Sequence, residues 1–91
     1  MKYNEIFKVF YKHAKIRAPS PISVDMLFDG FYITEMDIHW LEALTKENKN
    51  EIILAFNDNL KGRMTHCEEK KPMFDAIFLA YMDTVDELIN E

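Results

Sequence analysis

Glycine and proline are scarce in this sequence, with two Gly and three Pro among 91 residues. A sandwich or barrel of many short strands needs more turn residues than these, whereas long helices need few. The sequence also contains no P-loop and no glycine fingerprint for binding a nucleotide. The scarcity therefore predicts an all-α fold, a compact bundle of four to five short helices.

Cysteine and long apolar runs are also in short supply. The single cysteine, Cys67, cannot form an internal disulfide, which suits a reducing compartment. No apolar run approaches the ~20 residues that span a bilayer. Charges interrupt residues 1–17, so this stretch lacks the apolar region of a secretion signal. We therefore expect a cytoplasmic protein without a membrane partner, formed as one helical domain over residues 1–91.

The net charge of −5 is unevenly distributed along the chain. Residues 1–17 carry five Lys or Arg against one Glu, whereas residues 18–60 carry eight acids against two Lys. Residues 72–91 hold five acids and no Lys or Arg. Most of the surface should therefore repel a phosphate backbone and attract a basic partner surface, which disfavours nucleic acid as a partner.

Apolar residues recur every three or four positions in five segments, which predicts five amphipathic helices. The segments are roughly residues 3–16, 20–30, 34–44, 45 or 48 to 62, and 72–89. The predicted core combines their apolar faces: Ile6, Phe7, Phe10, Leu27, Phe28, Leu41, Leu44, Ile52, Phe56, Ile77, Tyr81 and Val85. A short strand at residues 30–33 is the alternative for one junction, because Phe-Tyr-Ile favours β structure.

Residues that begin and end helices stand at several of these boundaries. Ser20 is a predicted N-cap, and Thr34 is predicted to form a capping box with Asp37. Gly30 is expected to end the second helix in the left-handed conformation, and Gly62 to cap the fourth at its C-terminus.

The sequence offers little for catalysis or metal binding. His66 and Cys67 are adjacent, but no third residue is marked as their orienting partner, so a loop thiol beside a loop histidine is the simpler interpretation. Structural zinc requires two spaced ligand pairs, and only one cluster is present. Asp25 and Asp29 have the spacing of a chelating pair and equally that of two solvated acids. We therefore expect no enzyme activity, no cofactor and no metal.

Aromatic and methionine residues are abundant, with twelve aromatic side chains and six Met. A domain of this size has limited interior, so some should form an apolar patch at the surface. Aromatic and Met residues are enriched at interfaces, and acids around them would steer a basic partner. The predicted partner-binding residues are Asp37, Trp40, Glu42, Phe74, Phe78, Tyr81 and Met82.

Residues 44–62 resemble the C-terminal helical part of the AsiA family of small phage anti-sigma proteins. The shared pattern is Leu44-Thr45, Glu47, Lys49, Ile52-Ile53, Phe56-Asn57 and Gly62. The segments before and after this stretch depart from that family, so no functional residue is transferred from it. The resemblance implies a small helical regulator, of the kind made by phages, that acts on a host protein.

Together these observations predict a small acidic interaction module that binds a larger macromolecular target with a basic surface and inhibits or redirects it. A homodimer through the last helix is one further possibility. Two alternatives stay open. One is an immunity protein whose acidic surface covers the active site of a toxic nuclease. The other is a nucleic-acid-binding protein that uses the basic segment 1–17.

Overall fold

The computed structural model describes residues 2–90, and within this range the chain forms helices and connecting segments without a strand. The all-α prediction is confirmed, and the alternative strand at residues 30–33 is wrong. In chain order the elements are α1 (Tyr3–Arg17), the π-helix η1 (Met26–Gly30), α2 (Glu35–His39), the 3-10 helix η2 (Trp40–Ala43), α3 (Lys49–Met64), the 3-10 helix η3 (Glu68–Lys70) and α4 (Lys71–Ile89).

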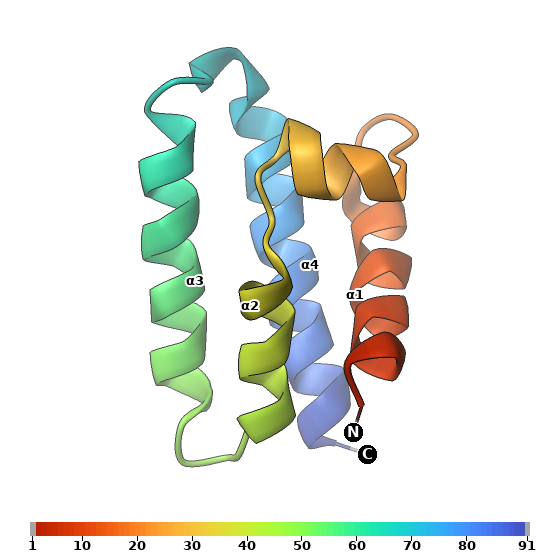
Figure 1. The fold of residues 1–91 in the computed structure, drawn as a ribbon, viewed down its shortest axis with the longest axis vertical. Helices are drawn as coiled ribbons and strands as arrows, with labels where there is room; N and C mark the ends of the chain where they lie inside the picture. Colours follow the sequence, from red (N-terminus) through yellow and green to blue (C-terminus); the bar gives the residue numbers. More distant parts are fainter. Residues whose placement is uncertain (1, 91) are drawn as a thin grey trace.

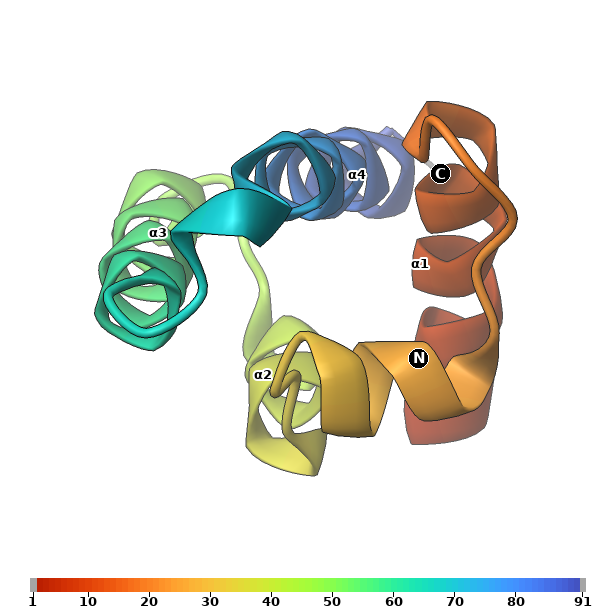
Figure 2. The ribbon, with the colours of Figure 1, turned by 90° about the horizontal axis from the view of Figure 1, so that it is seen from above.

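Of the three long helices, α4 lies between α1 and α3 and runs antiparallel to both (Figure 1), and α1 is tilted so that it extends from α4 towards η1 (Figure 2). The α1–α4 pair makes the most extensive helix contact. Seen from above, η1 and α2 form a layer against these helices (Figure 2). The arrangement leaves two separate outer surfaces, one on the η1–α2 layer and one along α3 and α4.

Side chains of the long helices and of the η1–α2 layer build the core. Of the twelve predicted core residues, eight are buried: Ile6, Phe10, Leu27, Leu41, Phe56, Ile77, Tyr81 and Val85. Three of the other four, Phe7, Leu44 and Ile52, are partly buried and pack against that core. The fourth, Phe28, is partly buried and stacks on Phe7 with 5.5 Å between ring centroids. The Tyr81 ring stacks on Phe56 with 3.7 Å between centroids and meets Phe10 edge-on at 5.8 Å. Aromatic pairs of this kind contribute about 0.5–1.5 kcal/mol each beyond the burial of their area.

The predicted start of the second helix is wrong. Residues 21–23 have no regular structure, and helical structure begins at residue 24. Ser23, rather than Ser20, serves the first turn, since its hydroxyl accepts the Met26 amide at 3.2 Å. The segment continues as a π-helix, whose wider turn changes which side chains face the core. Val24, at the start of the segment and before the π-helix, is exposed.

Neither glycine ends its helix in the predicted way. Gly30 does not adopt a positive φ, and the left-handed residue at this junction is Tyr32, with φ of 57°. Gly62 lies inside α3, which continues to Met64. Its carbonyl accepts the Thr65 hydroxyl at 2.8 Å, so a side chain provides the terminal hydrogen bond that a glycine cap would otherwise supply.

Candidate interaction surfaces

Asp37 forms the predicted capping box, but it is not an exposed acid. The Thr34 hydroxyl accepts the Asp37 amide at 3.3 Å, and the Asp37 carboxylate accepts the Thr34 amide at 2.8 Å. The Arg63 guanidinium donates to the same carboxylate, with an Nη1–Oδ2 distance of 3.1 Å. The side chain is only 1% exposed. The expected role of Asp37 in steering a partner is therefore wrong: capping and the ion pair to α3 hold its charge inside.

Phe74 and Tyr81 are also buried, which corrects their prediction as exposed partner contacts. The reason is the central position of α4: its inward side is covered by α1, α3 and the η1–α2 layer (Figure 2), while Asp75 and Leu79 on its outer side stay exposed. Phe74 meets Phe31 edge-on at 5.4 Å. The Tyr81 hydroxyl donates to the Asp37 carbonyl at 2.7 Å. Burial, with the Asp37 charge as a smaller cause, raises the pKa of Tyr81 well above its ordinary value.

The other four predicted contact residues reach the surface, but on two different sides. Trp40 and Glu42 lie on η2, where Trp40 is half-buried and Glu42 is exposed and 3.2 Å from His39. Phe78 and Met82 are half-buried on α4. The structure therefore does not bring the predicted residues together into one site.

The first accessible surface is the outer side of the segment from Val24 to Ala43, which we call the acidic layer. No Lys or Arg occurs between Arg17 and Lys46. Four acids of this segment are exposed, and Asp25, Asp29 and Glu35 have no ion pair to a base within residues 2–90. The Lys70 ammonium reaches this segment at the Gly30 carbonyl, 3.1 Å away, but forms no ion pair with these acids. The acidic layer thus carries acids without an ion-pair partner over a long stretch of chain.

Apolar side chains accompany these acids. Among residues 2–90, seven large hydrophobic side chains are exposed, and four of them lie in the acidic layer: Val24, Met26, Tyr32 and Met36. Met36 is the most exposed of the four, at 57%. Tyr32 is the one exposed aromatic in the described part of the chain, so Met and aliphatic side chains contribute most of the exposed apolar surface. Most other rings pack into or against the core, and methionine and aliphatic groups remain outside.

Only part of the acidic layer was recognisable in the sequence. The absence of Lys and Arg between residues 17 and 46 was the available signal, and it marks the segment more sharply than the total charge does. The exposure of Val24 was not recognisable, because a helical wheel at the α-helical period places Val24 with Leu27 and Phe28 on one face. The same wheel places Met26 on the opposite face, which agrees with its exposure. The π-helix breaks that period only beyond Val24.

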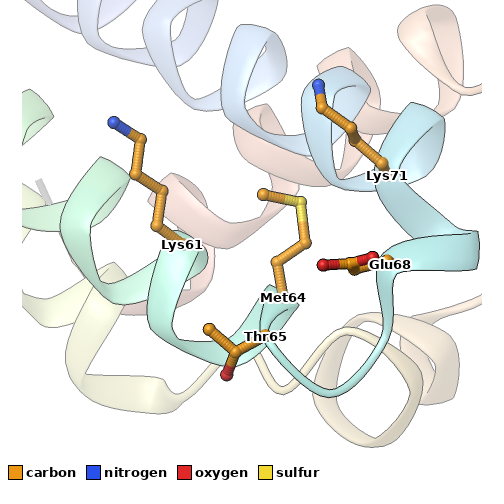
Figure 3. Close-up of a pocket in the computed structure, with 5 residues that line it drawn as sticks. All are labelled: Lys61, Met64, Thr65, Glu68 and Lys71. Atoms are coloured by element: carbon orange, nitrogen blue, oxygen red, sulfur yellow. The ribbon is translucent and has the colours of Figure 1, made fainter.

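The second accessible surface is a groove where α3 ends and α4 begins. A pocket of about 350 Å³ is lined by Lys61, Met64, Thr65, Glu68 and Lys71 (Figure 3). An adjoining pocket of about 170 Å³ shares three of these residues and extends along both helices to Phe78. We call this continuous surface the α3–α4 groove. Its floor is apolar, and Met64 lies between the two lysines that project from opposite helices (Figure 3).

The charges of the α3–α4 groove are balanced, unlike those of the acidic layer. Two lysines and two acids line it, and Lys71 is paired with Asp75 at 2.8 Å. Lys61 and Glu68 line the same pocket, yet no ion pair joins them to each other or to another residue within 2–90. The groove therefore presents one unpaired base and one unpaired acid beside exposed apolar surface.

Two of the five Lys and Arg residues in the basic segment 1–17, together with His13, form ion pairs within the fold. Lys12 and His13 both contact the Glu87 carboxylate of α4, at 2.8 and 2.9 Å. Arg17 pairs with Asp83 at 2.8 Å. The hydrogen bonds from Lys12 and His13 lower the pKa of Glu87 below its ordinary value. These contacts fasten α1 to α4 and reduce the positive charge that α1 can offer a nucleic acid.

Within residues 2–90, no group of three or more His, Cys, Asp or Glu side chains is placed to hold a metal ion. No helix there combines the length and apolar character needed to cross a membrane. Compared with protein-family models, curated protein sequences and solved structures, the chain matches none.

Proposed function

We propose that this protein is a small acidic interaction module that binds a basic surface on a larger macromolecular target through the acidic layer, and so inhibits or redirects it. One observation carries the proposal. A continuous segment without Lys or Arg exposes four acids and four large apolar side chains on the same layer of the fold. The cytoplasm is the proposed compartment, since Cys67 is unpaired by disulfide.

The combination of acids and apolar groups supports binding better than either does alone. Acids at the rim of an interface accelerate encounter with a basic partner, and this effect weakens as salt increases. Exposed Met and Tyr side chains provide apolar area that a partner can cover, and Met adapts its shape to the partner. The acidic layer is therefore complementary to a target surface that carries basic side chains with apolar area between them.

Intramolecular ion pairs disfavour the nucleic-acid alternative. Lys12 and Arg17, two of the five bases in residues 1–17, are paired with acids of α4, and His13 contacts Glu87 as well. The remaining lysines face a molecule with a net charge of −5. We therefore expect that a heparin or DNA column at low salt retains neither the wild type nor a Lys8/Lys12/Lys15→Glu variant.

The main test compares capture of the target by the wild type and by a charge-reversed variant. Asp25→Lys/Asp29→Lys/Glu35→Lys alters only exposed acids of the acidic layer. Glu5→Lys/Glu51→Lys/Asp58→Lys changes the charge equally, at exposed positions of α1 and α3. Extracts of the native host are passed over each immobilised protein, and bound proteins are identified by mass spectrometry.

We expect the immobilised wild type and the control variant to capture the same target protein, and the acidic-layer variant not to capture it. Association rates measured with the purified target should fall with increasing salt for the wild type. A target retained equally by both variants would show that the acidic layer does not bind it. Equal loss from both would show that only total charge matters, which also contradicts the proposal.

A further inference from the structure

We propose that the α3–α4 groove is a self-association surface, in which a second copy of this chain docks by a two-fold axis and pairs Lys61 of each copy with Glu68 of the other. This inference does not rest on the proposed function, because it concerns a different surface with a different charge pattern.

The unpaired charges of the groove select the occupant. A basic partner would oppose Lys61 and Lys71, and an acidic partner would oppose Glu68 and Asp75. A second copy related by a two-fold axis can pair both charges. In such an isologous contact, Lys61 of each copy faces Glu68 of the other, so the same ion pair forms twice. Lys61 and Glu68 line one pocket without pairing inside the chain, so both are free for this exchange.

Apolar surface in the groove supplies the area that the charges alone lack. Met64 and Phe78 are half-buried and provide the accessible apolar area of the groove, whereas Leu60 and Phe74, which also line the adjoining pocket, are themselves buried. Methionine and phenylalanine are among the residues enriched at protein interfaces. The charges around this floor set the register of the two copies, while covering the floor contributes the larger part of the affinity.

The acidic layer cannot serve the same purpose. Two copies placed with their acidic layers together would oppose uncompensated acids to acids, because no Lys or Arg lies in that segment. Self-association is therefore directed to the α3–α4 groove. The resulting dimer leaves its two acidic layers free, each for its own target.

The test is a charge exchange followed by sedimentation velocity and light scattering on the full chain. Lys61→Glu alone places two acids opposite each other at both symmetric contacts of the dimer, and Glu68→Lys alone places two bases there. The double variant restores an acid opposite a base at both contacts, with the two residues exchanged. Lys8→Glu makes the same change at an exposed position of α1, outside the groove. All four variants change exposed side chains, so thermal melting should confirm that each is folded.

We expect a concentration-dependent dimer for the wild type, built from the 10.8 kDa chain. Each single groove variant should raise the dissociation constant about tenfold, because two surface pairs are lost and replaced by repulsion. The double variant and Lys8→Glu should dimerise like the wild type. A wild type that stays monomeric up to its solubility limit would overturn the proposal. So would single variants without effect, or a double variant that fails to recover.

Discussion

The acidic layer and the α3–α4 groove differ in their apolar side chains and in how their charges are compensated. The acidic layer exposes four large apolar side chains, whereas Met64 and Phe78 of the groove are half-buried. The acidic layer has four exposed acids and no Lys or Arg in its segment. The groove has two acids and two lysines, of which Lys61 and Glu68 are unpaired within residues 2–90. An uncompensated surface repels its own copies, whereas a balanced one accepts them. This difference in charge balance is the reason why we propose a foreign partner for the acidic layer and a second copy for the α3–α4 groove.

A second comparison lies within the acidic layer itself, between its interior acid and its surface acids. Asp37 is buried against Arg63, whereas Asp25, Asp29 and Glu35 face water. The same type of side chain thus has a structural role in one place and is free for recognition in another. Mutations at the two kinds of position should consequently change different measured quantities.

The largest effect is expected from Asp37→Ala. This change removes the capping box and leaves the Arg63 side chain, which is 19% exposed, without its ion-pair partner. Breaking a buried ion pair on one side costs about 3–5 kcal/mol in the free energy of unfolding. Urea denaturation should show this loss, and Glu35→Gln on the same helix provides the exposed control. If the free energy of unfolding fell by only a small fraction of that amount, Asp37 would not be the residue that holds α2 to α3.

Tyr81→Phe should have the next largest effect. It leaves the Asp37 carbonyl without the hydroxyl that donates to it at 2.7 Å, at a cost of about 1–3 kcal/mol. The raised pKa of Tyr81 adds a pH dependence. The unfolded tyrosine ionises near pH ~10 while the folded one stays neutral, so stability is complete below that pH and falls as the pH rises above it.

Unfolding titrations between neutral and alkaline pH should therefore show a steeper loss of stability for the wild type than for Tyr81→Phe. Tyr3→Phe serves as a control at a partly buried tyrosine of α1. Equal slopes for the wild type and Tyr81→Phe would show that the contact between α4 and α2 does not depend on this hydroxyl.

The smallest effect on stability is expected at the surface acids. Asp29→Asn and Glu35→Gln remove charges that have no ion-pair partner within residues 2–90, so the free energy of unfolding should change by less than about 0.5 kcal/mol. Thermal melting measures this directly. A large loss of stability at either position would show that this acid, like Asp37, holds the fold together and is not free to bind a partner.

The helical class and most of the core could be predicted from the sequence, because they follow from local period and composition. The capping box of Thr34 and Asp37 was likewise visible, since its two partners are three residues apart. Arg63 lies 26 residues further along the chain, and nothing local indicates that it reaches Asp37. Burial of this acid is a tertiary property, and it overrode the expectation from charge alone.

The candidate surfaces were predictable only in outline. The sequence shows the stretch without Lys or Arg, but the α-helical period does not reveal that Val24 is exposed or that a π-helix follows it. The groove combines residues of α3 with residues of α4, and its charge balance appears only once the two helices are side by side. Phe74 and Tyr81 were assigned to a surface because a helical pattern does not tell how many neighbours surround the helix.

The most direct test of the account is one experiment on both surfaces, in which size-exclusion chromatography with light scattering follows the protein together with its purified target. The account predicts that Asp25→Lys/Asp29→Lys/Glu35→Lys remains a dimer and loses the target. It also predicts that Lys61→Glu still binds the target but dimerises with a dissociation constant raised about tenfold. A single variant that abolished both properties would contradict the separation of the two surfaces.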